Sequence, residues 1–231
     1  MARSFDEQLQ DPDAGVASDL DVDSDVLMVF FNGVIAQRGQ APFEFARITS
    51  DLGVKRLFLR DTQNSWYHAG VAGVSTNIEG TGAYLAEVAA IADARRVIYV
   101  GCSAGGYGAL LHGALVGPDS VVAFSPQTFI DRWNRLRFAD RRGRRRIPAF
   151  RKRFPRAPMQ DLRPVLASHP GTTRYDLYHG SIRLDRIHAR RLEPLPGVRR
   201  HELPVHKHLV VKAMRESGEL SQILEAAVRK G

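Results

Sequence analysis

The sequence predicts an α/β fold, built on a largely parallel β-sheet with helices on both faces. Two observations carry this prediction. Short, continuous apolar runs recur along the chain, and they alternate with longer segments whose apolar residues follow helical spacing. Continuous runs are typical of strands buried on both faces, and their alternation with helices implies crossover connections between parallel strands.

Length and composition limit the class of protein further. The chain has 231 residues, 44% of them hydrophobic, so it can bury one sizeable core but is short for two full domains. No apolar run approaches the ~20 residues of a membrane-spanning helix, and the acidic N-terminus has no apolar signal-peptide core. The single cysteine excludes an internal disulfide. We therefore expect a cytoplasmic protein without a membrane span.

The chain divides into a leader and one domain. Residues 1–24 are acidic and weakly periodic, which predicts a loosely ordered leader or an edge segment. Residues 25–231 form the predicted single domain. Within that domain, residues 127–170 are rich in Arg and Pro and have no convincing strand, so we expect an insertion over one end of the sheet.

The elements of the domain follow from periodicity and turn signals. Strands are predicted at 26–31, 54–59, 97–100, 121–124, 175–178 and 198–203. Helices are predicted at 43–52, 78–94, 107–115, 186–192 and 209–228, the last with a break near Gly218. We expect Gly80 and Gly82 to delay the second helix, so that its firm part begins near Ala83.

A motif with chemical meaning stands between the third strand and the following helix. It reads Gly101-Cys102-Ser103-Ala104-Gly105, which is G-x-S-x-G in a strand–turn–helix context. Such a turn holds a nucleophilic serine clear of the sheet, and bulky residues in place of the glycines would clash in its strained backbone. It also aims the Ala104 amide and the helix N-terminus at one point, where an oxyanion can be stabilised. A structural serine in an ordinary tight turn is the alternative.

A second donor to an oxyanion would come from the loop after an earlier strand. The first predicted strand ends in Asn32-Gly33-Val34, which places the amides of Gly33 and Val34 as candidates. Glycine at this point allows the backbone to approach a substrate closely. An ordinary turn that merely ends the strand explains the same residues.

A serine needs a base to become a nucleophile. In folds with a G-x-S-x-G turn of this kind, the catalytic residues follow one another along the chain in the order serine, acid, histidine. His208 is the last residue before the final helix, in the loop where the base is expected, and His206 is its rival two residues away. Asp185 follows the penultimate strand and could orient the base through its second ring nitrogen. Asp185 could equally act as a helix N-cap.

These residues resemble those of a known family. The run V-I-Y-V-G-C-S-A-G-G-Y-G-A-L at 97–110 resembles the nucleophile elbow of the α/β-hydrolases, and its S-A-G-G-Y form resembles small bacterial esterase-like members. F-F-N-G, D-T-Q-N-S-W-Y-H-A-G, A-F-S-P-Q-T, L-D-R-I-H-A-R-R-L and H-L-V-V-K-A-M-R-E-S-G-E-L extend the resemblance over most of 26–224. It implies a minimal version of the fold that lacks the first strands of larger members.

Further residues are candidates for substrate contact. Trp66, Tyr67 and His68 lie in a loop at the carboxyl ends of the strands, where open α/β sheets bind ligands. Together with Asn32 they could line a pocket for the acyl or alcohol group. Local packing of the loop is the alternative interpretation.

The net charge of +8 comes mainly from one stretch, 132–156, where only Asp140 opposes the basic residues. Those basic residues are Arg132, Arg135, Arg137, Arg141, Arg142, Arg144, Arg145, Arg146, Arg151, Lys152, Arg153 and Arg156. A solvated helical face, with interleaved aromatic residues packed on the domain, explains them most simply. An anionic substrate or surface is the second interpretation, and nucleic acid is the least favoured.

The sequence thus predicts a serine hydrolase that cleaves an ester or thioester through an acyl-enzyme. The predicted substrate is a small-molecule, glycan or lipid ester, and neither a metal nor a cofactor is required. An acyltransferase with the same three residues is the nearest alternative, because only acceptor binding separates the two. A non-catalytic anion-binding or nucleic-acid-binding protein on the same scaffold is the alternative from another class.

Overall fold

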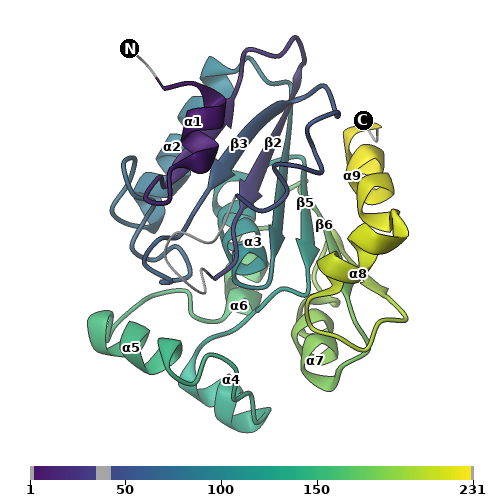
Figure 1. Cartoon of the computed structure of the whole chain (residues 1–231). Helices are drawn as coiled ribbons and strands as arrows, with labels where there is room; N and C mark the ends of the chain where they lie inside the picture. The colour runs from purple at the N-terminus through teal and green to yellow at the C-terminus, as the bar shows by residue number, and fades with distance from the viewer. Residues whose placement is uncertain (1–2, 35–42, 230–231) are drawn as a thin grey trace.

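A computed structural model describes residues 3–34 and 43–229 of the chain. In this part of the chain, seven strands form one sheet in the order β1-β3-β2-β4-β5-β6-β7 (Figure 1). The strands are β1 (Val16–Asp19), β2 (Val26–Phe31), β3 (Lys55–Leu59), β4 (Arg96–Cys102), β5 (Ser120–Phe124), β6 (Arg174–His179) and β7 (Val198–Glu202). β1 runs antiparallel to β3, and every other neighbouring pair is parallel, which confirms the predicted sheet.

Helices cover both faces of the sheet. One face carries α2 (Ile78–Ile91), α3 (Ala104–Val116), α6 (Leu162–Ser168) and α7 (Arg183–Leu192), whose buried residues share one core with the strands. The other face carries α1 (Phe5–Gln10), α8 (Val210–Ser217) and α9 (Glu219–Arg229) around a second core. Among the described residues, no helix has both the length and the apolar character needed to cross a bilayer.

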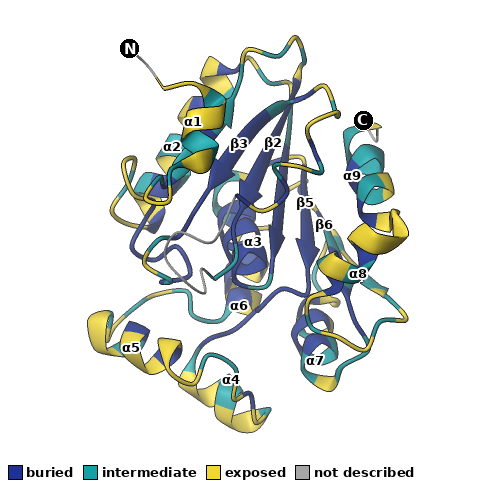
Figure 2. Ribbon diagram, viewed as in Figure 1, coloured by how far each residue is buried: buried dark blue, intermediate teal, exposed yellow. Residues whose placement is uncertain are grey.

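The central strands explain why the parallel sheet was predictable. All six residues of β2 are buried, since helices cover both of its faces, so its sequence is one continuous apolar run. β5 is buried throughout in the same way. In Figure 2 these strands form the buried centre of the molecule.

Helix α1 and the edge strand β1 lie within residues 1–24, and β1 pairs with β3, which agrees with the edge-segment alternative rather than the loose leader. The structure differs from the sequence-based expectations at two other places. The helix expected at 43–52 is a series of turns, since Phe45 has a left-handed φ of 70° that no α-helix tolerates. Helix α2 begins at Ile78 without delay, because the Asn77 side chain accepts a hydrogen bond from Gly80 N–H at 2.7 Å and caps it.

The basic segment forms two short helices, α4 (Arg132–Arg137) and α5 (Arg146–Arg153), beyond the carboxyl ends of the parallel strands (Figure 1). Their outer surfaces are exposed in Figure 2. Phe150 of α5 is buried and packs on Trp66, as the solvated-face interpretation expects. Trp133 of α4 does not pack on the domain in this way, since 76% of its surface is exposed.

Two glycines test the packing that positions the nucleophile turn. A Cβ at Gly105 would lie 2.0 Å from the Phe31 carbonyl oxygen, so Gly105→Ala forces backbone apart and should destabilise the fold by about 1–3 kcal/mol or more. Gly82 lies inside α2, and a Cβ added there would lie 3.6 Å from Val116 Cγ2, an ordinary van der Waals contact. Gly82→Ala should therefore stabilise the fold by about 0.5–1 kcal/mol. Denaturant unfolding measures both, and a Gly105→Ala protein as stable as the wild type would contradict this account.

Candidate active site

Ser103 sits on the sharp turn between β4 and α3, as its motif predicted. Its backbone has φ 54° and ψ −111°, a conformation that side-chain-bearing residues rarely adopt. Two backbone hydrogen bonds hold the turn: Ser103 N–H donates to the Phe124 carbonyl at 2.9 Å, and Gln127 N–H donates to the Ser103 carbonyl at 3.1 Å. The last residue of β5 and the loop after it therefore fix the serine from the neighbouring strand.

The glycines on either side of Ser103 allow this close packing. A Cβ at Gly101 would lie 2.3 Å from the Gly105 carbonyl oxygen across the turn. Gly105 in turn lies against the end of β2, at Phe31 and Asn32. The Asn32-Gly33 turn is thereby packed on the first turn of α3, next to the nucleophile.

The structure brings together the three residues that the sequence placed in catalytic roles. Ser103 Oγ lies 3.0 Å from His208 Nε2, and His208 Nδ1 lies 2.9 and 3.1 Å from the two oxygens of Asp185. An ionised carboxylate only accepts hydrogen bonds, so Nδ1–H donates to Asp185 and Nε2 is left to accept from the serine hydroxyl. The Asp185 side chain is fully buried, whereas that of His208 is 26% exposed.

The competing roles for these residues take other partners. His206, the rival of His208, is exposed, and its Nδ1 lies 3.1 Å from Ser181 Oγ. Asp185 is not the N-cap of α7, because the cap is Ile182 and Asp185 lies in the first turn. The chain order of serine, acid and histidine is therefore matched in space by Ser103, Asp185 and His208 alone among these candidates.

The predicted oxyanion donor Gly33 already has an acceptor. Its N–H donates to Glu44 Oε2 at 3.0 Å, and the Glu44 N–H donates to the Asn32 side-chain oxygen at 3.0 Å. Part of Glu44 is exposed, yet the protein packed around its carboxyl raises its pKa above the usual value, against the opposing effects of Gly33 N–H and Arg215. No sequence pattern pointed to Glu44.

The aromatic loop residues are held by protein partners. Trp66 Nε1–H donates to the Gln127 side chain at 2.7 Å, and the Tyr67 hydroxyl donates to the Asn32 carbonyl at 2.9 Å. Both ring nitrogens of His68 lie 2.9 Å from backbone carbonyl oxygens. All three side chains are buried. They fix the walls around the elbow, and their contact with a substrate stays a prediction, as do the oxyanion roles of Ala104 and Val34.

A buried polar network lies behind Asp185. Arg142, from the basic insertion, donates through Nη1 to Asp185 Oδ1 at 3.0 Å and pairs with Asp140 through Nε and Nη2. Burial lowers the pKa of His188 to about 4, so the neutral ring donates through Nε2–H to Asp140 at 3.1 Å. Burial alone would raise the pKa of Asp140, but the hydrogen bonds from His188 and Arg142 hold it well below its usual value.

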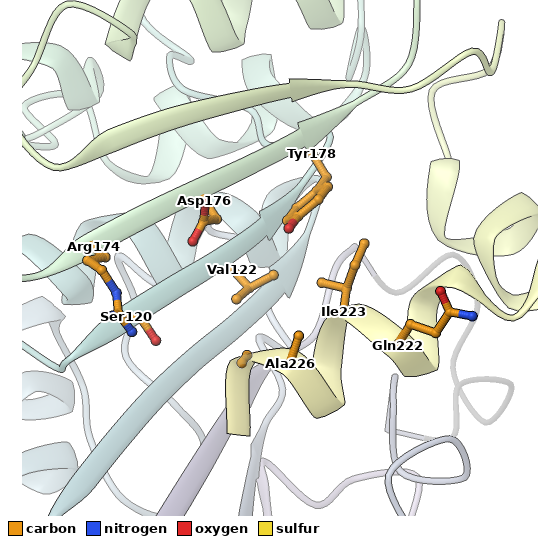
Figure 3. A pocket seen from close by; sticks show the side chains of 9 residues that line it. Ser120, Val122, Arg174, Asp176, Tyr178, Gln222, Ile223 and Ala226 are labelled. Carbon is orange, nitrogen blue, oxygen red and sulfur yellow. The ribbon is translucent and has the colours of Figure 1, made fainter. Parts of the chain in front are cut away.

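A separate pocket of about 140 Å³ lies on the face of the sheet that carries α8 and α9. It is bounded by strands β5 and β6 and helix α9 (Figure 3). Its lining residues are Ser120, Val122, Arg174, Asp176, Tyr178, Gln222, Ile223, Ala226 and Ala227. None of them was a candidate from the sequence. Within residues 3–34 and 43–229, no group of three His, Cys, Asp or Glu side chains is arranged to hold a metal ion.

The comparisons with known proteins bear on the fold. No family model matches the chain, and no curated protein does. Among solved structures, the Glycosylation Associate Protein (Gap123) complex from Streptococcus agalactiae matches with a TM-score of 0.65 at 16% identity. The match covers 93% of this chain and 44% of that one, so this chain spans less than half of that protein.

Two other solved structures match over most of both chains. The capsule O-acetyltransferase of Neisseria meningitidis serogroup A has a TM-score of 0.61 at 14% identity, covering 90% of each chain. FphF, a fluorophosphonate-binding serine hydrolase of Staphylococcus aureus, has a TM-score of 0.57 at 12% identity, covering 85% of this chain and 83% of that one. At such identities the likeness shows the fold alone, and the chain has the α/β-hydrolase fold.

Proposed function

We propose that this protein is a serine hydrolase that cleaves an ester or thioester through an acyl-enzyme. The observation that carries the proposal is the continuous line of hydrogen bonds from Ser103 Oγ through His208 to Asp185, at 3.0 and 2.9 Å. A serine on a strained turn with a histidine base in reach is the arrangement that activates a hydroxyl as a nucleophile.

In the first step, Ser103 Oγ attacks the carbonyl carbon while His208 Nε2 takes the hydroxyl proton. The negative charge moves to the carbonyl oxygen, where the Ala104 and Gly33 amides can donate to it. Collapse of this intermediate breaks the bond to the leaving group, which receives the proton from His208. Asp185 keeps the imidazole in the required tautomer and stabilises its charged form.

In the second step, water replaces the leaving group. His208 removes a proton from the water as its oxygen attacks the acyl carbon. The second tetrahedral intermediate then collapses, Ser103 leaves with the proton from His208, and the acid product is released. The proposed substrate is a small-molecule, glycan or lipid ester. The cytoplasmic location expected from the sequence stays a prediction.

Covalent labelling with a fluorophosphonate probe tests the proposal without a known substrate. Ser103→Ala should abolish labelling, because no other residue is proposed to be activated. His208→Ala and Asp185→Asn should slow it by a factor on the order of 10⁴. His206→Ala is the matched control in the same loop and should label at the wild-type rate. A folded wild type that does not label, or labels equally after Ser103→Ala, would contradict the proposal.

Glu44 should compete with the substrate for the Gly33 amide. A hydrogen bond to a charged group contributes about 1.5–3 kcal/mol, so removing the carboxylate should raise the labelling rate by about 10–150-fold. Glu44→Ala tests this, and Glu44→Gln, which keeps an oxygen acceptor for Gly33 N–H, should raise it less. A labelling rate that falls in the folded Glu44→Ala protein would show that Glu44 supports the turn rather than competing at it.

Acyl transfer from an anionic donor is the second candidate. It is favoured by a cavity of about 310 Å³ beside α5, lined by Arg146, Arg153, the polar residues 63–65 and the apolar side chains of Ala149, Phe150 and Phe154. Arg and polar groups of this kind suit phosphate or carboxylate ligands. Product analysis with and without an acceptor alcohol separates the two candidates: a hydrolase releases free acid in both cases, whereas a transferase forms the new ester.

A further inference from the structure

The basic insertion reaches the proposed catalytic acid through one residue. Arg142 lies 43 positions before Asp185, and its Nη1–H donates to Asp185 Oδ1 at 3.0 Å. That same oxygen accepts from His208 Nδ1–H at 2.9 Å. We propose that Arg142 is a positioning residue, which holds the Asp185 carboxylate facing His208 and so keeps the serine activated. This inference rests on the proposed function of that site.

The Arg142 side chain is itself fixed from behind. Asp140 accepts from its Nε at 3.1 and 3.2 Å, from its Nη2 at 2.8 Å and from its backbone N–H at 2.9 Å. Asp140 is held in turn by His188, which lies 3.1 Å away and is completely buried. The planar guanidinium therefore bridges two carboxylates in one orientation, which an ammonium group cannot reproduce.

Asp185 requires such a partner because its side chain is fully buried. A buried carboxylate is costly unless it is paired and accepts hydrogen bonds. Among the described residues its side chain has two donors, His208 and Arg142. His208 must gain and lose a proton at its other nitrogen during the reaction, so Arg142 is the donor whose charge and position stay constant.

The chemistry distinguishes Arg142 from the other arginines of the insertion. Arg141 and Arg144 are exposed, and neither forms an ion pair within the described residues. Arg142 is only 19% exposed at its side chain and pairs with both acids, whereas Arg135, at 14% exposed, pairs with Asp140 alone, at 3.8 Å. The insertion thus serves the site through Arg142, whatever its outer arginines bind.

Three variants test the inference: Arg142→Met, Arg142→Lys and, as the matched control, Arg141→Gln. Fluorophosphonate labelling should slow by about 10–100-fold in Arg142→Met, by analogy with metal-ligating side chains that lose the hydrogen-bond partner that orients them. Arg142→Lys keeps the charge without the planar fork, so it should recover part of that rate. Arg141→Gln should label as the wild type.

A proton NMR measurement separates positioning from general structural support. The Nδ1 proton that His208 shares with Asp185 should give a far-downfield signal in the wild type, absent from His208→Ala. In Arg142→Met this signal should shift or disappear, whereas Arg141→Gln should keep it. Thermal unfolding shows whether each variant is folded. If Arg142→Met does not fold, the labelling rate and the downfield signal of Arg142→Lys decide instead.

The outcomes separate this inference from the proposed function. A folded Arg142→Met protein that keeps the downfield signal overturns the inference, whether or not it labels more slowly, because Asp185 is then positioned without Arg142. Wild-type labelling at the same rate in that variant also overturns it. A wild type that never labels, yet has a downfield signal sensitive to Arg142→Met, overturns the proposed function while the positioning role stands.

Discussion

The packing of two chain segments around the first turn of α3 is the constraint on which the rest of the structure depends. Ser103 holds a backbone conformation of a kind that costs on the order of 1–3 kcal/mol, and it persists only because its surroundings fix it. The end of β2 lies against Gly105 from one side, and the last residue of β5 and the loop after it bind the Ser103 backbone from the other. A serine oxygen clear of the sheet is the consequence.

The electrostatics of the site follow from burial. Asp185 and Asp140 both lie below the surface. Arg142 donates to both, and Asp140 also accepts a hydrogen bond from His188. Arg142 bridges them, and Arg135 lies 3.8 Å from Asp140, so the basic insertion offsets both buried carboxylates. Arg151 donates to the Ile130 carbonyl at 2.9 Å, and the remaining basic residues of the insertion are exposed, where their charges are screened and available to a ligand. The insertion therefore has an inner face and an outer face with different roles.

Much of the fold could be predicted because its strongest signals are local. Val26–Phe31 was predicted to the residue, since a strand buried on both faces leaves an unbroken apolar run. The edge strand β1 was not, because it has only one fully buried residue and no such run. The helix expected at 43–52 failed at Phe45, whose positive φ depends on tertiary packing and has no sequence signature.

The site divides in the same way. Ser103, Asp185 and His208 could be selected because chain order and position relative to strands constrain them. Arg142 could not be distinguished from eleven other basic residues in its segment, since an ion pair across 43 residues has no periodic pattern. Glu44 was missed for the same reason, as its bond to Gly33 joins two turns.

The most direct measurement is a crystal structure of the wild type after reaction with a fluorophosphonate. The account predicts phosphorus bonded to Ser103 Oγ, with its oxygen accepting from the Ala104 and Gly33 amides and the Glu44 carboxylate displaced from Gly33. His208 should lie within hydrogen-bonding reach of the adduct. An adduct on another residue, or a phosphonyl oxygen directed away from both amides, would contradict the assignment of the elbow as the catalytic centre.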